Sequence, residues 1–348
     1  MRLTFIINDI ATEAPTFTTT RLARRAIQLG HDIALVSLRD LTYEVDETVS
    51  GIASVPQAGD YEDDAALLAE LQAPDAPRKR RVLTDDDVML LRADPADELP
   101  QCPWAHGSSL LFAQLAAERG VIVLNDPYKL TDASNKTYFQ QYPSQIRPRT
   151  CITRDPEAIK AFMKNEGGRA VIKPLQGSGG QGVFVIADGS NANLNQMIEA
   201  TVRDGYAIVQ EYLPLANEGD LRVLTMNGEV LQVDGHYACI RRYNDTGDPR
   251  SNITVGGKVE LVEPGPEVFE ILELAGPKIR RDGMYLAGLD IVGNKMMEIN
   301  VDTPGGLTQL EELSGQDFSG TIIRDLERKV RLRDAYGGSL GHLEIATL

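Results

Sequence analysis

The stretch KPLQGSGGQG, from Lys173 to Gly182, places a lysine at the end of an apolar segment and then five Gly or Ser residues in nine positions. The segments AVIKPL at 170–175 and GVFVIA at 182–187 predict two strands, so the stretch reads as a β-hairpin with a glycine-rich tip. A Walker loop differs, because its glycines lead into a helix and its lysine comes last. Glycine lets backbone N–H groups approach an anion closely, so the tip either cradles a phosphate or simply turns the chain.

The composition limits the class of protein. A chain of 348 residues is long for one core and predicts two or three packed domains. The net charge of −16 argues against general binding to nucleic acid or to an anionic membrane, which attract Lys and Arg. The three cysteines show no C-x-x-C spacing, so neither a disulfide framework nor a zinc cluster is expected. The first ten residues hold only a short apolar run, and we expect a cytoplasmic protein.

Residues 1–125 predict a small N-terminal α/β domain. A strand at 2–8, an amphipathic helix that begins near Thr18, and a strand at 33–38 form a β-α-β unit. The first turn lacks G-x-G-x-x-G, so dinucleotide binding is not expected there. The polar stretch 59–87 contains four consecutive basic residues, and we interpret it as a solvated loop rather than a basic binding patch.

The sequence pattern changes from Asp126 onward. DPYKLTDASNKTYFQQYP predicts a loop and then a helix capped near Asp132 or Ser134, with Lys136 in its first turns. Further on, AIVQEYLP at 207–214 predicts a strand. The segment 218–231 predicts two strands joined by a tight turn at Asn227 and Gly228.

The segment LAGLDIVGNKMMEINVDTPGG, at 286–306, brings three oxygen-bearing side chains together. Glu298 and Asn300 are two apart on one predicted strand and so share a face, and Asp290 lies on the strand before the turn. Such a set suits Mg²⁺, which takes one or two carboxylates and completes its octahedron with water and phosphate oxygens. A solvated acidic sheet face is the alternative.

The order Lys136, Lys173, glycine-rich hairpin, QEYLP, GDLR, the loop arginines, GLDIVG and EINVDTPGG resembles the bacterial glutathione synthetases, which are ATP-grasp ligases. The resemblance covers nearly the whole chain. It implies an α/β protein in which antiparallel sheets grip ATP, preceded by a small parallel-sheet domain. The implied domains are 1–125 (N-terminal), 126–205 (ATP-grasp small or lid subdomain) and 206–348 (catalytic subdomain with C-terminal helices).

The resemblance also implies the ligands and their residues. ATP and two Mg²⁺ ions, with Mn²⁺ as a possible substitute, would bind between the sheets, and an acyl phosphate formed from the substrate carboxylate would be attacked by an amine. The nucleotide would be bound by Lys136, Lys173, Gly177, Ser178, Gly179, Gly180, Gln181, Gly182, Gln210, Glu211, Tyr212, Leu213 and Asp220. The metal ligands would be Asp290, Glu298 and Asn300; the catalytic arginines Arg222, Arg242 and Arg250; and the substrate-binding residues Asn252, Thr303, Gly305 and Gly306.

Several positions depart from the family pattern. Ala93 replaces a lysine, and Tyr243 stands where a small Ile-Pro pair is usual. The segment DTPGG at 302–306 stands in place of T-S-P-T-G, so that Asp302 and Gly305 differ from the family pattern. The expected reaction joins γ-glutamylcysteine to glycine, with a different amino-acid or peptide pair as the alternative. A non-catalytic ATP-binding module is disfavoured because no ATP-binding lysine and no metal-binding position is lost. The expected partners are these small molecules, and the family suggests a homodimer or homotetramer.

Overall fold

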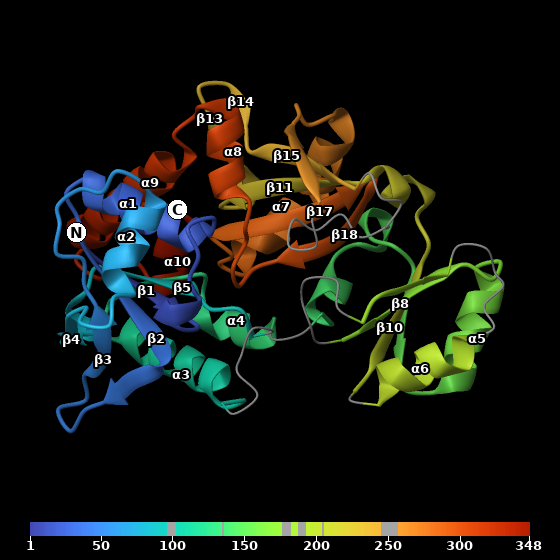
Figure 1. Ribbon diagram of the computed structural model, residues 1–348, viewed down its shortest axis with the longest axis horizontal. Helices are drawn as coiled ribbons and strands as arrows, with labels where there is room; N and C mark the ends of the chain where they lie inside the picture. Colours follow the sequence, from blue (N-terminus) through green and yellow to red (C-terminus); the bar gives the residue numbers. More distant parts are fainter. Residues whose placement is uncertain (96–101, 134–135, 176–181, 187–192, 204, 245–256) are drawn as a thin grey trace.

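The computed structural model describes residues 1–95, 102–133, 136–175, 182–186, 193–203, 205–244 and 257–348. Its three main sheets follow one another along the chain (Figure 1). The first lies in the blue part of the ribbon, the second in the green and yellow lobe at the opposite end, and the third between them in yellow and orange.

The first sheet has the strand order β4-β3-β2-β1-β5-β6. Its strands are β1 (Arg2–Ile7), β2 (Asp32–Tyr43), β3 (Val49–Ser54), β4 (Arg78–Val82), β5 (Val88–Arg92) and β6 (Ile122–Leu124). The strands β2, β1, β5 and β6 run parallel, whereas β3 and β4 are antiparallel additions at one edge. The expected parallel α/β unit is therefore present and is extended by two antiparallel edge strands that the sequence did not indicate.

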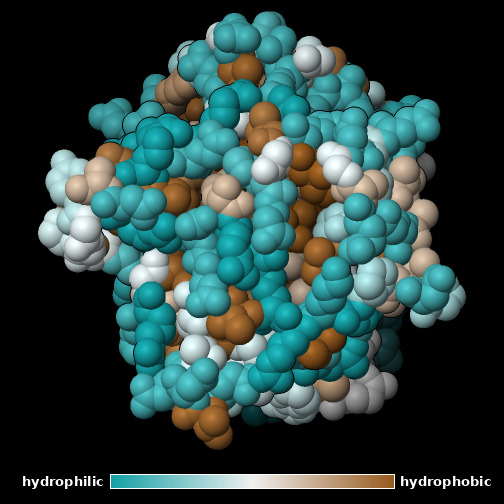
Figure 2. Space-filling model, turned by 90° about the vertical axis from the view of Figure 1, so that its left-hand side faces the viewer, coloured by the Kyte–Doolittle hydropathy of each residue, from teal (hydrophilic) through white to brown (hydrophobic). Residues whose placement is uncertain are grey.

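Helices cover both faces of this sheet. Alternate residues of β1 enter two different cores: Leu3 and Phe5 pack with α1 (Thr18–Gln28) and α2 (Asp64–Leu71), and Ile6 packs with α3 (Ala105–Glu118). This is the period-2 burial of a strand that is covered on both sides. Seen from the end that carries the N-terminus, the surface shows hydrophobic side chains in separate patches among hydrophilic ones (Figure 2).

The prediction of a solvated loop over 59–87 is wrong. The stretch contains α2 and the edge strand β4, and Arg81 is buried. Its guanidinium lies 3.0 Å from the Asp86 carboxylate and 2.9 Å from that of Asp32, which comes from another strand. A basic residue can be buried when its charge is paired and hydrogen-bonded, and this pairing depends on tertiary contacts.

The second sheet has the order β7-β10-β8-β9 and is antiparallel. Its strands are β7 (Thr150–Thr153), β8 (Ala170–Pro174), β9 (Phe184–Ile186) and β10 (Ala207–Glu211), and α5 (Pro156–Asn165) and α6 (Leu194–Val202) cover one face. The pairing of Ile172 with Phe184 confirms the hairpin predicted on either side of the glycine-rich stretch. The expected boundary at 205/206 falls just before β10, a strand of this sheet.

The third sheet has the order β16-β15-β11-β17-β18, with β12 paired to β11. Its strands are β11 (Asp220–Met226), β12 (Glu229–Val230), β15 (Cys239–Tyr243), β16 (Lys258–Leu261), β17 (Leu286–Val292) and β18 (Lys295–Asn300). A small hairpin, β13 (Gln232–Val233) and β14 (His236–Tyr237), stands beside it, and α7 (Pro266–Arg281) packs against it.

The predicted turn between β11 and β12 is confirmed. Asn227 and Gly228 have φ of 52° and 78°, which is the left-handed geometry that an Asn-Gly hairpin turn uses. The C-terminal segment forms α8 (Leu307–Ser314), α9 (Phe318–Tyr336) and α10 (His342–Thr347), and α9 packs on α1 of the first domain. In the ranges described, no helix is both long enough and apolar enough to cross a membrane.

The helix expected to start near Asp132 or Ser134 starts earlier. The helix α4 spans Pro127–Asp132, and the Asp126 carboxylate caps it by accepting a hydrogen bond from the Lys129 backbone N–H at 2.8 Å. Proline at the first helical position and Asp before it form a strong N-terminal signal. Lys136 therefore follows this helix instead of lying in its first turns.

Candidate active site

A carboxylate cluster lies on one face of the third sheet. Asp290 on β17 pairs directly with Glu298 on β18, and Asn300 pairs with Gly288. The Asn300 amide nitrogen is 3.5 Å from an Asp290 carboxylate oxygen. The ladder shifts register between Asp290 and Ile291, at the place where this cluster forms. The three predicted metal ligands are thus brought together.

Two arginines from neighbouring strands hold Asp290. Arg222 on β11 donates from Nε and Nη2 to the two carboxylate oxygens, at 2.6 and 3.1 Å. Arg242 on β15 is buried and lies 3.0 Å from the same carboxylate. Its Nε also donates to Asp220 at 2.7 Å, so Asp220, expected to contact the ribose, is engaged with an arginine here.

These contacts fix the charge of Asp290. Burial alone would raise the pKa of the carboxyl, but Arg222 and Arg242 outweigh burial and lower the pKa to about 2. Asp290 is therefore an anion at neutral pH. Two carboxylates and an amide are the hard oxygen ligands that suit Mg²⁺. In the described part of the chain, no group of three or more His, Cys, Asp or Glu side chains could hold a metal ion. The present cluster contains two such side chains, Asp290 and Glu298, because its third ligand is the amide of Asn300.

The two predicted phosphate-binding lysines face this cluster. Lys136 Nζ is 3.3 Å from Glu298 Oε1. Lys173, at the end of β8, is half-buried, and burial lowers its pKa, with repulsion from Lys136 adding to the effect and attraction to Glu298 and Asp290 opposing it. Positive charge from Lys173 on the second sheet, and from Lys136 in the segment before that sheet, thus lies opposite negative charge from the third sheet.

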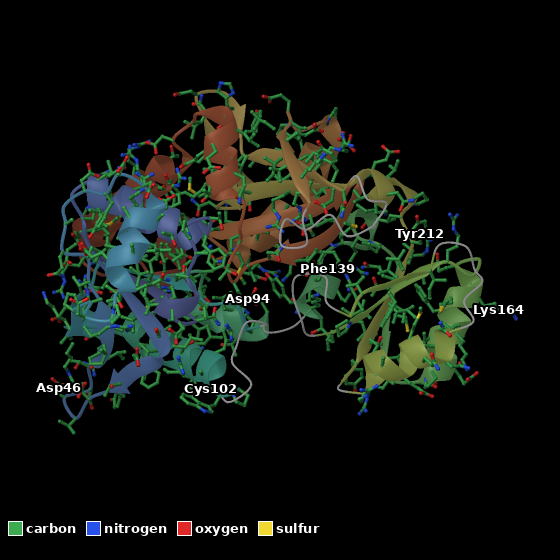
Figure 3. All side chains as sticks on the ribbon, in the orientation of Figure 1. Asp46, Asp94, Cys102, Phe139, Lys164 and Tyr212 are labelled. Atoms are coloured by element: carbon green, nitrogen blue, oxygen red, sulfur yellow. The ribbon has the colours of Figure 1, made fainter. Side chains whose placement is uncertain are left out.

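The hinge segment 210–213 joins these two sheets. Gln210 and Glu211 are buried at the end of β10, and Tyr212 follows at the junction of the two lobes (Figure 3). Gln210 donates from its amide to Thr150 at 3.3 Å, and the Glu211 backbone N–H donates to the Arg149 carbonyl at 2.9 Å. The Arg149 guanidinium pairs with the Glu211 carboxylate and, at 2.7 Å, with Glu166.

The loop after β18 is held by Arg222. Arg222 Nη1 donates to the Gly305 carbonyl at 3.1 Å. Gly306 has φ of 113° just before α8, a conformation that favours glycine. Half-buried Thr303 precedes them. Among the departures from the family pattern, Asp302 lies 3.7 Å from the His106 ring.

Some expected site residues lie outside the described residues. They are Gly177, Ser178, Gly179, Gly180, Gln181, Arg250 and Asn252. Gly182 is described and has φ of 68°. A Cβ added at this position would lie 3.3 Å from Cδ of Pro174.

Sequence reasoning missed two arginines near the site. Arg92, at the end of β5, is buried and donates to the Pro304 carbonyl at 3.1 Å, next to the carbonyl that Arg222 holds. Arg149 contacts Glu211 of the hinge segment through its backbone carbonyl and its guanidinium. An arginine that ends an apolar strand, as in VMLLR, was the available signal for Arg92.

Solved structures share this architecture, among them one of the ATP-grasp ligase PsnB, with a TM-score of 0.56 at 18% identity, over 94% of this chain and 98% of its own. D-cycloserine synthetase DcsG is similar with a TM-score of 0.60 at 11% identity, over 94% of this chain and 99% of its own. The macrocyclase MdnC from Microcystis aeruginosa has a TM-score of 0.59 at 15% identity, over 94% of this chain and 100% of its own. The shared architecture is the ATP-grasp fold, as expected from the sequence.

Sequence comparisons identify the family. The prokaryotic glutathione synthetase N-terminal domain matches residues 1–131, and its ATP-grasp domain matches residues 135–315. The glutathione synthetase of Synechococcus elongatus is 31% identical over 95% of this chain and 99% of its own length. The glutathione synthetase of Brucella melitensis is 31% identical over 90% of this chain and 93% of its own length. The chain belongs to the prokaryotic glutathione synthetase family, whose members use ATP with a divalent metal ion.

Proposed function

We propose that this chain joins γ-glutamylcysteine to glycine in an ATP- and Mg²⁺-dependent reaction and so forms glutathione. The observation that carries the proposal is the meeting of Lys136 and Lys173 with Glu298 and Asp290 across two sheets. A triphosphate with its metal ion needs cations on one side and oxygen ligands on the other, and this arrangement supplies both. Family membership supplies the substrates.

In this proposal the nucleotide lies between the second and third sheets. Lys136 and Lys173 contact its phosphates, the glycine-rich residues 177–182 cover them, and the backbone of 210–213 meets the adenine. Asp220 contacts the ribose while Arg242 neutralises it. Triphosphate binding favours the charged form of Lys173, whose pKa burial has lowered, so binding promotes protonation of this lysine.

The metal ion would be held by Asp290, Glu298 and Asn300, and when bound it supplies positive charge to the phosphates. We propose two such ions and Mn²⁺ as a substitute. Arg222 and Arg242 keep Asp290 ionised and aimed, so they position a metal ligand. Arg222 also holds the Gly305 carbonyl and so fixes the substrate loop that includes Thr303 and Gly306. Arg250 and Asn252 would complete the site.

The reaction itself needs no nucleophilic side chain. The γ-phosphate moves to the cysteinyl carboxylate, which gives an acyl phosphate and ADP. The glycine amine attacks the acyl carbon, a C–N bond forms, and phosphate leaves with the carboxylate oxygen. Positioning and electrostatic stabilisation by preorganised groups drive such a transfer.

We extend the proposal to the whole molecule. The proposed division is an N-terminal domain (1–125), a lid subdomain (126–205) and a catalytic subdomain (206–348), whose first strand, β10, completes the sheet of the lid subdomain. A cytoplasmic location agrees with three cysteines that are all free thiols. A symmetric homo-oligomer is the expected assembly.

The test is product formation by the purified chain. With ATP, Mg²⁺, γ-glutamylcysteine and glycine, we expect glutathione by mass spectrometry and one ADP per product, with a turnover of roughly 1 to 1000 per second. Replacing glycine by other amines, or γ-glutamylcysteine by other γ-glutamyl peptides, tests the alternative pair. Phosphate release with another pair, without glutathione formation, would contradict the proposal.

A further inference from the structure

The segment 138–146 attaches the chain next to Lys136 to the lobe of the third sheet. It begins two residues after this lysine and leads to β7 of the second sheet. Its buried side chains pack in the same core as Ile279 of α7 and Met296 of β18. They are Tyr138, Phe139, Tyr142 and Ile146. Within the described residues, the core of the second sheet includes none of the four. The segment therefore packs with the third sheet, and Phe139 lies where the two lobes meet (Figure 3).

A buried lysine lies at the centre of this attachment. Lys278 is in the last turn of α7 and is 9% exposed. Its ammonium group lies 4.4 Å from the centre of the Tyr138 ring and 5.4 Å from that of the Tyr142 ring. It also donates a hydrogen bond to the side-chain oxygen of Gln141 at 2.9 Å. A cation removed from water is attracted to aromatic faces and to a carbonyl dipole, so Lys278 holds three residues of the segment.

Asp282 completes the attachment on the side of α7. Its carboxylate is 3% exposed, pairs with Lys278, and accepts a hydrogen bond from the Tyr138 hydroxyl at 2.9 Å. The other carboxylate oxygen accepts from Arg281 at 3.0 Å. The buried charges are thus paired and hydrogen-bonded, which is the condition under which a folded protein tolerates them. The segment beside Lys136 is held by charge as well as by apolar packing.

A second lysine attaches the same segment to the strand of the metal ligands. Lys295, the first residue of β18, donates to the Gln145 carbonyl at 2.7 Å, three residues before Glu298. Lys136 in turn lies 3.3 Å from Glu298. The segment is therefore attached to the third sheet on both sides of the metal site. Lys173 lies on β8 of the second sheet, so the two phosphate-binding lysines are carried by different sheets.

We propose that Lys278 is a positioning residue for the phosphate-binding Lys136. The inference rests on the proposed ligase function. Held by Asp282, Lys278 fixes the backbone at Tyr138, so that the Lys136 ammonium stays opposite Glu298, where the triphosphate and its metal ion bind. Such positioning matters because misplacing a group by about 1 Å lowers a rate by as much as about 100-fold. Lys278 acts through Lys136, because its own ammonium is enclosed by the segment.

A double-mutant cycle in ligand binding tests this role. The dissociation constant of a non-hydrolysable ATP analogue with Mg²⁺ is measured by calorimetry for the wild type, Lys136→Met, Lys278→Met and the double variant. Lys136→Met should weaken binding by about 10-fold, and Lys278→Met by about 3- to 10-fold. The double variant should bind no more weakly than Lys136→Met, because a residue that acts through Lys136 has no effect once that lysine is absent.

Lys329→Met is the matched control. Lys329 is also a buried helical lysine, with its ammonium 5.0 Å from the centre of the Tyr285 ring and 3.6 Å from Asp325, four residues away. Its backbone partners are the Ile345 and Ala346 carbonyls of α10, far along the chain from Lys136. Loss of this ammonium should therefore leave the affinity for the ATP analogue within about 2-fold of the wild type.

A milder variant keeps the test open if Lys278→Met does not fold. Tyr138→Phe keeps the aromatic ring and removes only the hydrogen bond from the hydroxyl to Asp282. It should weaken binding of the analogue in the wild-type background and should have no effect in the Lys136→Met background. Turnover gives a second measurement: Lys278→Met should lower kcat/KM for ATP and leave the KM for glycine within about 2-fold.

The outcomes separate the two proposals. Unchanged affinity in Lys278→Met, an equal loss in Lys329→Met, or a loss that persists undiminished in the Lys136→Met background would overturn the positioning role. A KM for glycine that rises as much as that for ATP would also overturn it. Failure of the wild type to bind the analogue would overturn both proposals. Coupled binding without glutathione formation by the wild type would support the positioning role and contradict the proposed reaction.

Discussion

Replacing Asp290 by Asn should affect folding and catalysis together. The carboxylate is 5% exposed and pairs with two arginines. Its pKa of about 2, against a usual value of 3.8, corresponds to about 2 kcal/mol at about 1.4 kcal/mol per pH unit. Asn keeps the shape but leaves the guanidinium groups without this counter-charge, so we expect a loss of about 2 to 4 kcal/mol in unfolding free energy.

Urea unfolding at pH 7 without ligands measures this loss, and Glu298→Gln is the matched control. Glu298 is 34% exposed and pairs with a partly exposed lysine, so its substitution should cost under about 1 kcal/mol. Both variants should lose Mg²⁺-dependent turnover. The reasoning fails if Asp290→Asn unfolds within about 0.5 kcal/mol of the wild type, or if the two variants lose equal stability.

Asp290 should also determine how the unfolding free energy depends on pH in acid. Because the folded pKa of Asp290 is depressed, its contribution is complete above the unfolded value of about 4 and is lost as the pH falls toward 2. Asp290→Asn should therefore show a flatter decline in unfolding free energy over this window than the wild type.

Three further substitutions test separate parts of the structure. Lys173→Met should weaken ATP binding by about 10-fold or more in calorimetry. The affinity of the variant should also fall less as the pH rises, because the wild-type lysine must be protonated to bind phosphate. Unchanged affinity would contradict the role of Lys173. Burial lowers the pKa of Lys329 to about 8 from a usual 10.5, so the unfolded chain holds more protons between these values and stability should rise with pH there; Lys329→Met should abolish that rise in urea titrations. Gly228→Ala should cost about 2 to 3 kcal/mol, since φ is 78° and a Cβ would lie 2.6 Å from the Gly276 carbonyl, and an unchanged urea midpoint would refute this.

Local patterns predicted the parts of the fold that depend on neighbouring residues. The Asn227 and Gly228 turn needs two residues that accept positive φ, and the shared face of Glu298 and Asn300 follows from the period of two in a strand. The glycine-rich hairpin was likewise visible from its flanking strands. These features require no knowledge of distant partners.

The features that were missed depend on distant partners. Arg81 is buried because Asp32 and Asp86 reach it, and Arg92 meets the Pro304 carbonyl from 212 residues away. The start of α4 was ambiguous because Asp126, Asp132 and Ser134 are all good N-cap types. Pro127, at the first helical position, distinguishes them.

Oxygen transfer tests the proposed reaction most directly. γ-Glutamylcysteine labelled with oxygen-18 in its cysteinyl carboxylate is turned over with ATP, Mg²⁺ and glycine, and the released phosphate is analysed by mass spectrometry. An acyl phosphate leaves with one substrate oxygen, so the phosphate should carry one oxygen-18 atom for each glutathione formed. Unlabelled phosphate alongside labelled glutathione would contradict the acyl phosphate route and the site built to support it.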